Sequence, residues 1–308
     1  MSIINRENEG LPSILLTITA ILIREKAISR DDLLKFCFPE SLSDSDKGKD
    51  RSTRFRGTLN RWTTLGLFKE NGDEIRLAFE PKRGETSVEF LDRLPSVCVR
   101  LPLDPAYGNP LWPVDGRASE EGAGLSADFC RGLSWCLSQD IYVLPTSWSE
   151  LENLIREQMK PGRFVFMNNT RWEGMRDWAR FFGFAYGDDS SIFFDPTKAI
   201  RSQLFDVLKP GENLAAAEFL ERLARIFPVI DRGAYRIEVE ETLKSEKWSA
   251  PKIGHLSTSL SFALRRLQKQ GVLGLSTLAD AESKFTLVGQ EGRLWDSFTH
   301  VSLLKELT

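Results

Sequence analysis

Six basic side chains between positions 47 and 61 are the strongest candidate for chemistry in this sequence. One acid, Asp50, interrupts them, so the segment carries a net charge of plus five in a chain whose total is -3. Basic side chains at this density can neutralise phosphates, and an Arg guanidinium can also donate two parallel hydrogen bonds to guanine. The candidate nucleic-acid-binding residues of this segment are Lys47, Lys49, Arg51, Arg54, Arg56 and Arg61.

A second basic segment lies near the carboxyl end of the chain. Between Lys252 and Lys269 the sequence contains no acid. Small hydroxyl side chains at the start of a helix let phosphates approach its backbone N–H groups. The candidate nucleic-acid-binding residues here are Ser257, Thr258, Arg265, Arg266 and Lys269. For the first segment the alternative is a solvated helix face, and for the second it is a helix that serves only packing or dimerisation.

The middle of the chain gives a weaker pattern. Its basic residues are offset by Glu173 and Asp177, and they alternate with large aromatic side chains. Such side chains form a core or a protein contact more often than a base-stacking platform. We therefore expect a scaffold or protein-binding role for the middle region, whose basic residues are Arg163, Arg171, Arg176 and Arg180.

Residues that could support catalysis are few. Asp73 followed by Glu80-Pro81-Lys82 resembles the acid pattern of metal-dependent nucleases, but Pro81 interrupts the strand that the motif needs. His255 and His300 have no nucleophile in a suggestive context, and no phosphate-binding loop follows a strand. We expect a non-enzymatic protein with no cofactor and no metal, and a nuclease is the least favoured alternative.

The elements that would carry the first basic segment form a compact series. The pattern predicts helices over 11–26 and from Ser29, which can cap a helix that Pro39 stops. A third helix over 51–65 has Phe55, Leu59 and Trp62 on one stripe and ends at Gly66. A hairpin with an Asn71-Gly72 turn follows. Three helices followed by a hairpin are typical of a winged helix.

The same order recurs near the end of the chain. The sequence predicts helices over 213–227, 235–243 and 255–270, then strands starting at 272 and over 284–288. When Gly66 is set against Gly271, the first buried stripe aligns with Leu260, Leu264 and Leu267. This is a repeat of architecture without sequence identity. We therefore predict a mainly α protein with small β-hairpin wings, built from tandem winged-helix domains.

Between these units the sequence predicts a degenerate third copy. Its helices are expected near 125–139 and 148–159, the latter with a capping box of Ser147 and Glu150, and an aromatic helix ends at Gly183. Residues 101–124, rich in Pro and Gly, are expected to be a linker or an extended docking strap. The predicted divisions are 1–100, 101–124, 125–209 and 210–308, with a helix near 86–94 packing on the first unit.

Composition limits the class of protein. A chain of 308 residues with a slightly negative total charge is not a globally basic nucleic-acid binder. The four cysteines form no CxxC pair, which favours reduced, buried thiols in a cytoplasmic protein. The longest apolar run, 11–23, is too short to span a bilayer and lacks the features of a secretory signal, so no membrane contact is expected.

Several short segments resemble the DpdG family. The resemblance implies an accessory component of bacterial systems that place 7-deazaguanine derivatives in DNA and restrict unmodified DNA, and hence a role in phage defence. It supplies no catalytic residues, and it implies DNA and other proteins of the same system as partners. The segments that carry the resemblance are Met1-Ser2-Ile3-Ile4-Asn5, Gly10-Leu11-Pro12-Ser13-Ile14-Leu15, Asn109-Pro110-Leu111-Trp112-Pro113 and Ala127-Asp128-Phe129.

Two functions therefore remain open at the level of sequence. The favoured one is a non-enzymatic DNA-binding accessory protein that uses the two basic helices. The alternative is a scaffold whose winged helices bind proteins. The sequence leaves the choice between DNA and RNA, the specificity and the oligomeric state undetermined.

Overall fold

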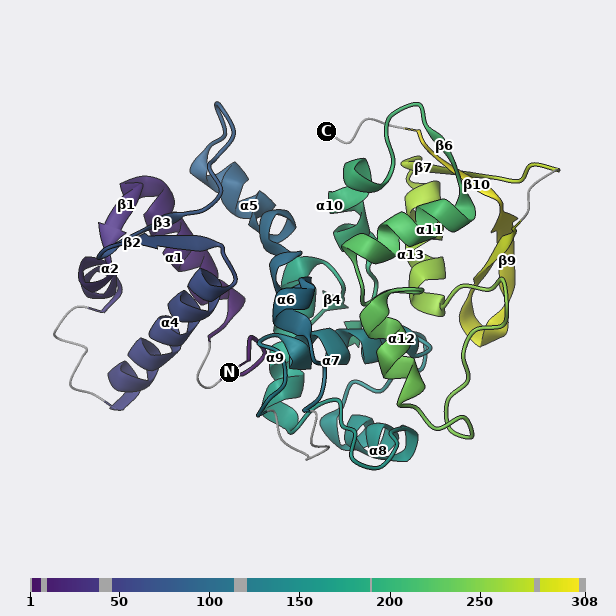
Figure 1. Ribbon diagram of the computed structural model, residues 1–308, viewed down its shortest axis with the longest axis horizontal. Coiled ribbons are helices and arrows are strands. Elements are labelled where there is room, and N and C mark those ends of the chain that lie inside the picture. Colours follow the sequence, from purple (N-terminus) through teal and green to yellow (C-terminus); the bar gives the residue numbers. More distant parts are fainter. Residues whose placement is uncertain are drawn as a thin grey trace.

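The computed structural model describes residues 2–6, 10–38, 46–113, 121–188, 190–279 and 283–304, and over 46–50 it describes the backbone alone. The described chain is mainly helical and contains small antiparallel sheets (Figure 1). Within the described part, no helix is both long and apolar enough to cross a membrane.

The N-terminal unit has the element order that the sequence predicts, with one additional strand. Its three strands form an antiparallel sheet in the order β1-β3-β2. The elements are α1 (Pro12–Glu25), β1 (Ala27–Ser29), α2 (Arg30–Cys37), α4 (Asp46–Thr64), β2 (Phe68–Asn71) and β3 (Glu74–Leu77).

Local sequence explains the boundaries of these elements. The Ser29 hydroxyl accepts a hydrogen bond from the Asp32 backbone N–H and caps α2 as predicted. After α4, Gly66 adopts a φ of 87°, a left-handed conformation that glycine adopts without steric cost. The predicted Asn71-Gly72 turn joins β2 to β3, and the buried stripe of α4 consists of Phe55, Leu59 and Trp62.

The C-terminal unit repeats the strand order of this sheet, but it has one additional helix and begins with a helix that was not expected. In chain order it contains one helix, one strand, three helices and two strands. Its sheet has the strand order β6-β10-β7. The edge strand that follows the first helix is thus paired with the last strand in both units. The elements are α10 (Thr197–Val207), β6 (Asn213–Ala215), α11 (Ala216–Ile226), α12 (Ala234–Glu241), α13 (Thr258–Lys269), β7 (Leu273–Ser276) and β10 (His300–Leu303).

Two predictions for this unit are wrong in detail. Residues 213–215, predicted to begin a helix, form strand β6, because pairing with β10 buries Leu214 beside Val301. The strand over 284–288 does not return to β7. It is β8 (Phe285–Val288) and forms a separate hairpin with β9 (Leu294–Phe298), while β10 pairs with β7. Helix α10, which the sequence pattern did not single out, packs on α11 and α13.

The middle region contains the elements predicted for it. Helix α7 is followed by two further helices and a two-stranded hairpin. The helix predicted near 86–94, within the first division, extends to Cys98 and packs on α1 of the first unit as predicted. Ser147 precedes α8, but its hydroxyl donates to the Glu150 carboxylate and caps no backbone N–H, so the predicted capping box is incomplete. The elements are α5 (Ser87–Cys98), α7 (Ala127–Ser138), α8 (Trp148–Gln158), α9 (Asn169–Phe182), β4 (Tyr186–Gly187) and β5 (Ile192–Phe193).

A single hydrophobic core joins the three regions. The Trp62 ring of α4 lies 5.4 Å from the ring of Trp178 on α9, and Phe182 packs against both. Helix α5 contacts α1, α9 and α10 and runs between the two terminal units (Figure 1). The aromatic stripe of α9 therefore belongs to the core.

Residues 101–113 form a docked strap. They contain the short helices η1 (Leu101–Leu103) and α6 (Pro105–Gly108), and Leu111 and Trp112 are buried. The Trp112 indole N–H donates to the Phe164 carbonyl over 2.8 Å, and the buried Arg131 of α7 donates to the Leu111 carbonyl over 3.0 Å. Of the two alternatives for 101–124, a docked strap is the one that residues 101–113 show.

The cysteines are reduced. All four are free thiols, and Cys98, Cys130 and Cys136 are buried, as predicted, whereas Cys37 is half-buried. Burial in an apolar environment raises the pKa of the Cys136 thiol well above its ordinary value, because the thiolate would lose its hydration. These thiols pack as small apolar side chains and are not activated nucleophiles.

Candidate nucleic-acid interface

The exposed face of α4 carries part of the basic segment. Thr53, Arg56, Asn60 and Thr64 are exposed and share one stripe of the helix, opposite the buried residues. Arg51 is also exposed, five positions before Arg56 and about 140° around the helix from it, and Arg54 is half-buried. The side chains of Lys47 and Lys49 lie outside the described residues.

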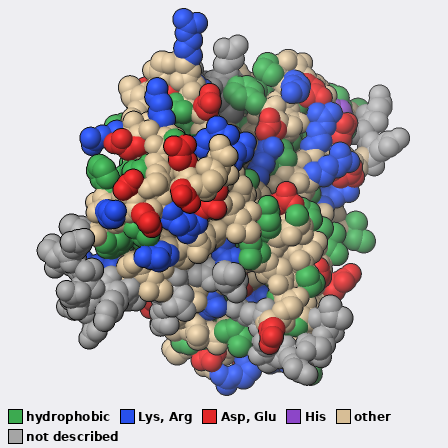
Figure 2. Space-filling view, turned by 60° about the vertical axis from the view of Figure 1, so that its left-hand side comes forward, with side chains coloured by type: hydrophobic (Ala, Val, Ile, Leu, Met, Phe, Trp, Pro, Cys, Tyr) green, Lys and Arg blue, Asp and Glu red, His purple; other side chains and the backbone are tan. Residues whose placement is uncertain are grey.

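The amino-terminal half of α4 points away from the rest of the molecule, whereas its carboxyl-terminal half packs against the middle region (Figure 1). On the face that Figure 2 draws, with the left-hand side of Figure 1 brought forward, Lys and Arg side chains are interspersed with Asp and Glu. The positive surface is therefore local, in agreement with the negative total charge.

Arg61 has a different environment from the other basic residues of α4. Only 2% of its surface is exposed, and its guanidinium donates to the Leu125 carbonyl over 3.4 Å. This contact joins α4 to the segment that precedes α7. Arg61 therefore links two regions of the protein and does not present its charge to solvent.

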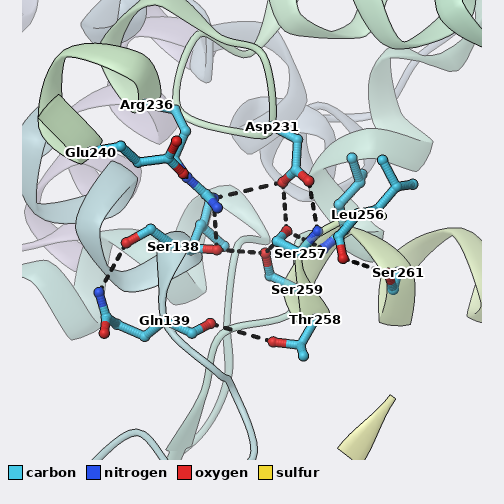
Figure 3. Close-up of polar contacts among 12 residues, drawn as sticks. Ser138, Gln139, Asp231, Arg236, Glu240, Leu256, Ser257, Thr258, Ser259 and Ser261 are labelled. Atoms are coloured by element: carbon cyan, nitrogen blue, oxygen red, sulfur yellow. Dashed lines mark hydrogen bonds and ion pairs between the residues drawn. The ribbon is translucent and has the colours of Figure 1, made fainter. Parts of the chain in front are cut away.

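The amino end of α13, the second predicted contact, is enclosed by protein groups (Figure 3). The Ser257 hydroxyl caps the helix by accepting from the Leu260 N–H over 3.3 Å. The Asp231 carboxylate accepts both the backbone N–H of Ser257, over 2.7 Å, and its hydroxyl. Thr258 donates to the Gln139 carbonyl. A phosphate would find these donors already occupied.

The same contacts complete the carboxyl end of α7. The last carbonyls of a helix lack intrahelical partners and need donors from elsewhere. Here Arg236 of α12 and Ser259 of α13 both donate to the Leu137 carbonyl over 2.7 Å, and the Trp248 indole donates to the Ser138 carbonyl over 3.2 Å. The carboxyl end of α7 is thus joined to the amino end of α13.

Arg236 is the centre of this joint. Its side chain is 1% exposed, lies 3.6 Å from the Asp231 carboxylate and also pairs with Glu240 (Figure 3). A buried guanidinium needs such carboxylates, because losing its hydration is costly. Sequence analysis missed Arg236 and Asp231, since neither belongs to a local motif. Arg236 donates to Leu137, 99 positions earlier in α7, and Asp231 accepts from Ser257, 26 positions later.

The basic residues farther along α13 are largely engaged. The Arg265 guanidinium lies 4.0 Å from the centroid of the Trp295 ring. Arg266 donates to the buried Asp195 carboxylate over 2.6 Å and lies over the Tyr186 ring of β4. Lys269 is exposed at the end of the helix. The middle region therefore pairs with Arg266, whose side chain is still 47% exposed, while β9 lies against Arg265.

The acidic pattern considered for a nuclease is spread along the hairpin and the loop after it. Asp73 lies in the β2–β3 turn, Glu80 and Lys82 are exposed beyond the end of β3, and the Lys82 backbone N–H donates to Glu85. His255 lines a pocket of about 390 Å³ together with Asp140 and Lys252. Among the residues that the structure describes, no group of three His, Cys, Asp or Glu side chains is arranged to hold a metal ion.

The described architecture defines a mainly helical protein with small antiparallel sheets and a locally basic, exposed helix. A family model described as DpdG-like matches residues 1–281. The chain belongs to the DpdG-like family, as the sequence resemblance predicted, and the family indicates an association with the Dpd 7-deazaguanine modification system. No curated protein and no solved structure matches the chain.

Segments that carried the resemblance meet in the fold. The Ser2 hydroxyl donates to the buried carboxylate of Asp128 at the start of α7, and Arg171 of α9 lies 3.5 Å from the same carboxylate. The strap residue Leu111 accepts from Arg131 on the next turn of α7. These segments therefore hold the middle region together, which is a structural role.

Proposed function

We propose that this protein is a non-enzymatic DNA-binding accessory component of a Dpd 7-deazaguanine modification and restriction system, acting in the bacterial cytoplasm. In this proposal both terminal units are winged helices, and the N-terminal one contacts duplex DNA. The observation that carries the proposal is the exposed stripe of α4. It presents Arg56 from the helix that occupies the position of a recognition helix, and the amino-terminal part of the same helix also exposes Arg51.

The topology supports the winged-helix assignment. In both units the strand after the first helix lies at one edge of the sheet, and the last strand is central. The hairpin β2–β3 then corresponds to the wing. Because Asp73 and Glu74 are exposed at its tip, phosphates are repelled there, and the main contact is expected at α4.

Binding through Arg51 and Arg56 is tested by retention on duplex DNA at several salt concentrations. Each phosphate contact contributes about 0.9 to the slope of log affinity against log salt concentration. The double change Arg51→Glu and Arg56→Glu should lower the slope by about 2 and weaken binding roughly 10- to 100-fold near 0.1 M salt. Salt dependence that is the same as in the unchanged protein would exclude α4 as the interface.

A matched control is available on the same unit. Arg24 and Lys35 have side chains that are 77% and 74% exposed and lie on α1 and α2. The double change Arg24→Glu and Lys35→Glu alters the total charge equally. We expect a smaller loss of affinity than for the α4 variant, because long-range attraction is reduced while the local contacts remain.

The alternative, a protein-binding scaffold, is favoured for the C-terminal unit by a specific observation. Its helix α13 already contacts other parts of the chain through Ser257, Ser259 and Arg266. If this unit acts as a scaffold, a partner from the same system should co-purify with the full chain. The α4 variant should retain that partner while losing DNA.

A further inference from the structure

A polar cluster of three side chains lies beside the exposed stripe of α4. Arg30, the first residue of α2, donates to the Asn60 side-chain oxygen over 2.6 Å. The same guanidinium pairs with the Glu70 carboxylate of β2. The three residues come from three different elements and are separated by up to 40 positions in the chain.

The cluster is accessible. The Arg30 side chain is 36% exposed, that of Glu70 is 39% exposed, and Asn60 is exposed one helical turn after Arg56. A ligand that lies along Arg56 therefore also meets this cluster. Because Asn60 and Glu70 hold the guanidinium from two sides, Arg30 loses less side-chain entropy on binding than an unrestrained arginine.

The chemistry of the cluster differs from that of a phosphate site. A phosphate contact gains most of its affinity from positive charge, which the neighbouring Glu70 reduces here. Base edges in the major groove need a defined arrangement of donors and acceptors, for which Arg, Asn and Glu are the side chains that pair with guanine, adenine and cytosine. An arginine has five N–H donors, so those that do not bond Asn60 and Glu70 remain for a base.

We infer that Arg30, positioned by Asn60 and Glu70, recognises guanine in the major groove of duplex DNA by donating to its O6 and N7 atoms. The inference rests on the proposed function and adds a base-specific contact to it. Arg51 and Arg56 supply affinity through phosphates, whereas Arg30 supplies sequence preference. Asn60 and Glu70 act as positioning residues.

The first test is selection from a random duplex DNA library at one salt concentration. The unchanged protein should enrich sequences with guanine at a fixed position, and Arg30→Ala should lose that preference while still binding bulk duplex. Lys35→Ala, a change on the same helix, should keep the preference. Retention without any preferred guanine, or an Arg30→Ala variant with the same preference, would overturn the inference and leave the proposed function standing. Absence of retention on every duplex would overturn both.

The second test removes one acceptor from the DNA. In 7-deazaguanine a C–H group replaces N7, so a duplex with this base at the selected position can accept only one of the two hydrogen bonds. We expect the unchanged protein to bind it roughly 5- to 100-fold more weakly than the guanine duplex. Arg30→Ala should bind both duplexes equally. Equal binding of the two duplexes by the unchanged protein would exclude the N7 contact.

The variant Asn60→Ala separates positioning from charge. It leaves the number of basic residues unchanged, so the salt dependence of binding should equal that of the unchanged protein. The preference for guanine over 7-deazaguanine should fall, because one side of the guanidinium is no longer held. Thermal unfolding of both variants shows whether the N-terminal unit remains folded. A full preference in Asn60→Ala would contradict the positioning role.

Discussion

Helices α4 and α13 occupy the same place in two units of the same topology, yet one is presented and the other is enclosed. The stripe of α4 opposite the core is exposed at Arg56 and Asn60. The amino end of α13 is bonded to Asp231 and Gln139, and Arg266 is paired with Asp195. The difference shows that a shared pattern of buried residues does not determine which helix face is accessible to a ligand. Accessibility depends on the regions that pack against the helix.

The largest expected effect concerns the joint that encloses α13. Replacing the buried Arg236 by methionine leaves Asp231 and Glu240 without their cation and the Leu137 carbonyl without one of its donors. We expect a loss of about 3–5 kcal/mol in the free energy of unfolding. Denaturant unfolding measures it. The exposed Arg225 of α11 offers a control, since Arg225→Met should change stability by less than about 0.5 kcal/mol. Equal effects would mean that the joint does not stabilise the C-terminal unit.

A matched pair of charge reversals compares the two helices directly. Arg56→Glu on α4 should weaken duplex DNA binding roughly tenfold near 0.1 M salt, because one phosphate contact is lost and a repulsion is added. Lys269→Glu, also at an exposed site, should have little effect, since the surface of α13 before it is occupied. Retention on duplex DNA measures both. A larger effect of Lys269→Glu than of Arg56→Glu would indicate that α13, and not α4, contacts the DNA.

Two serines at helix starts give a smaller contrast. The Ser29 hydroxyl accepts from the Asp32 backbone N–H. The Ser147 hydroxyl instead donates to the Glu150 carboxylate and caps no backbone N–H. Ser29→Ala should destabilise the protein by about 1 kcal/mol and Ser147→Ala by a few tenths. Thermal unfolding of the two variants gives the order. The reverse order would show that the Ser147–Glu150 contact is the stronger one.

The smallest effect is a dependence on pH in the segment that precedes α5. Two hydrogen bonds from Arg93 hold the pKa of Glu85 at about 2, below its usual range. The ionised carboxylate favours the folded state above the ordinary glutamate pKa of 4.5, and the contribution is lost as the pH falls through about 2. Titration followed by NMR should give that low pKa, and Arg93→Gln should raise it towards 4.5. An ordinary pKa in the unchanged protein would contradict the contact.

Much of the secondary structure could be predicted from local sequence. The capping residue Ser29, the Asn71-Gly72 turn, and the glycines after α4, α9 and α13 act through backbone conformation within a few residues, so their effect is visible in the sequence. The strand partners of the C-terminal unit could not be predicted in this way. Strands β7 and β10 are separated by a whole inserted hairpin, and their pairing depends on burial of residues such as Val301.

The candidate site residues likewise divide into those that local sequence identified and those that depend on the fold. Charge and helical spacing alone identified Arg51 and Arg56 as exposed basic residues of α4, and the same reasoning grouped the buried Arg61 and Ser257 with them. Burial of those two depends on segments far away in the chain. The cluster of Arg30, Asn60 and Glu70 was missed, because a strand and a turn must fold before the three side chains meet.

The sequence by itself determined the mainly helical class, the helix–hairpin order of the N-terminal unit and the local excess of positive charge on the 51–65 segment, since these depend on composition and short-range periodicity. The tertiary structure alone decided which basic helix is accessible. The reason is physical: a guanidinium or helix end is directed to solvent or to a carboxylate by whatever packs against it. In this protein α7 and Asp231 close the amino end of α13, while the amino-terminal half of α4 extends away from the body (Figure 1).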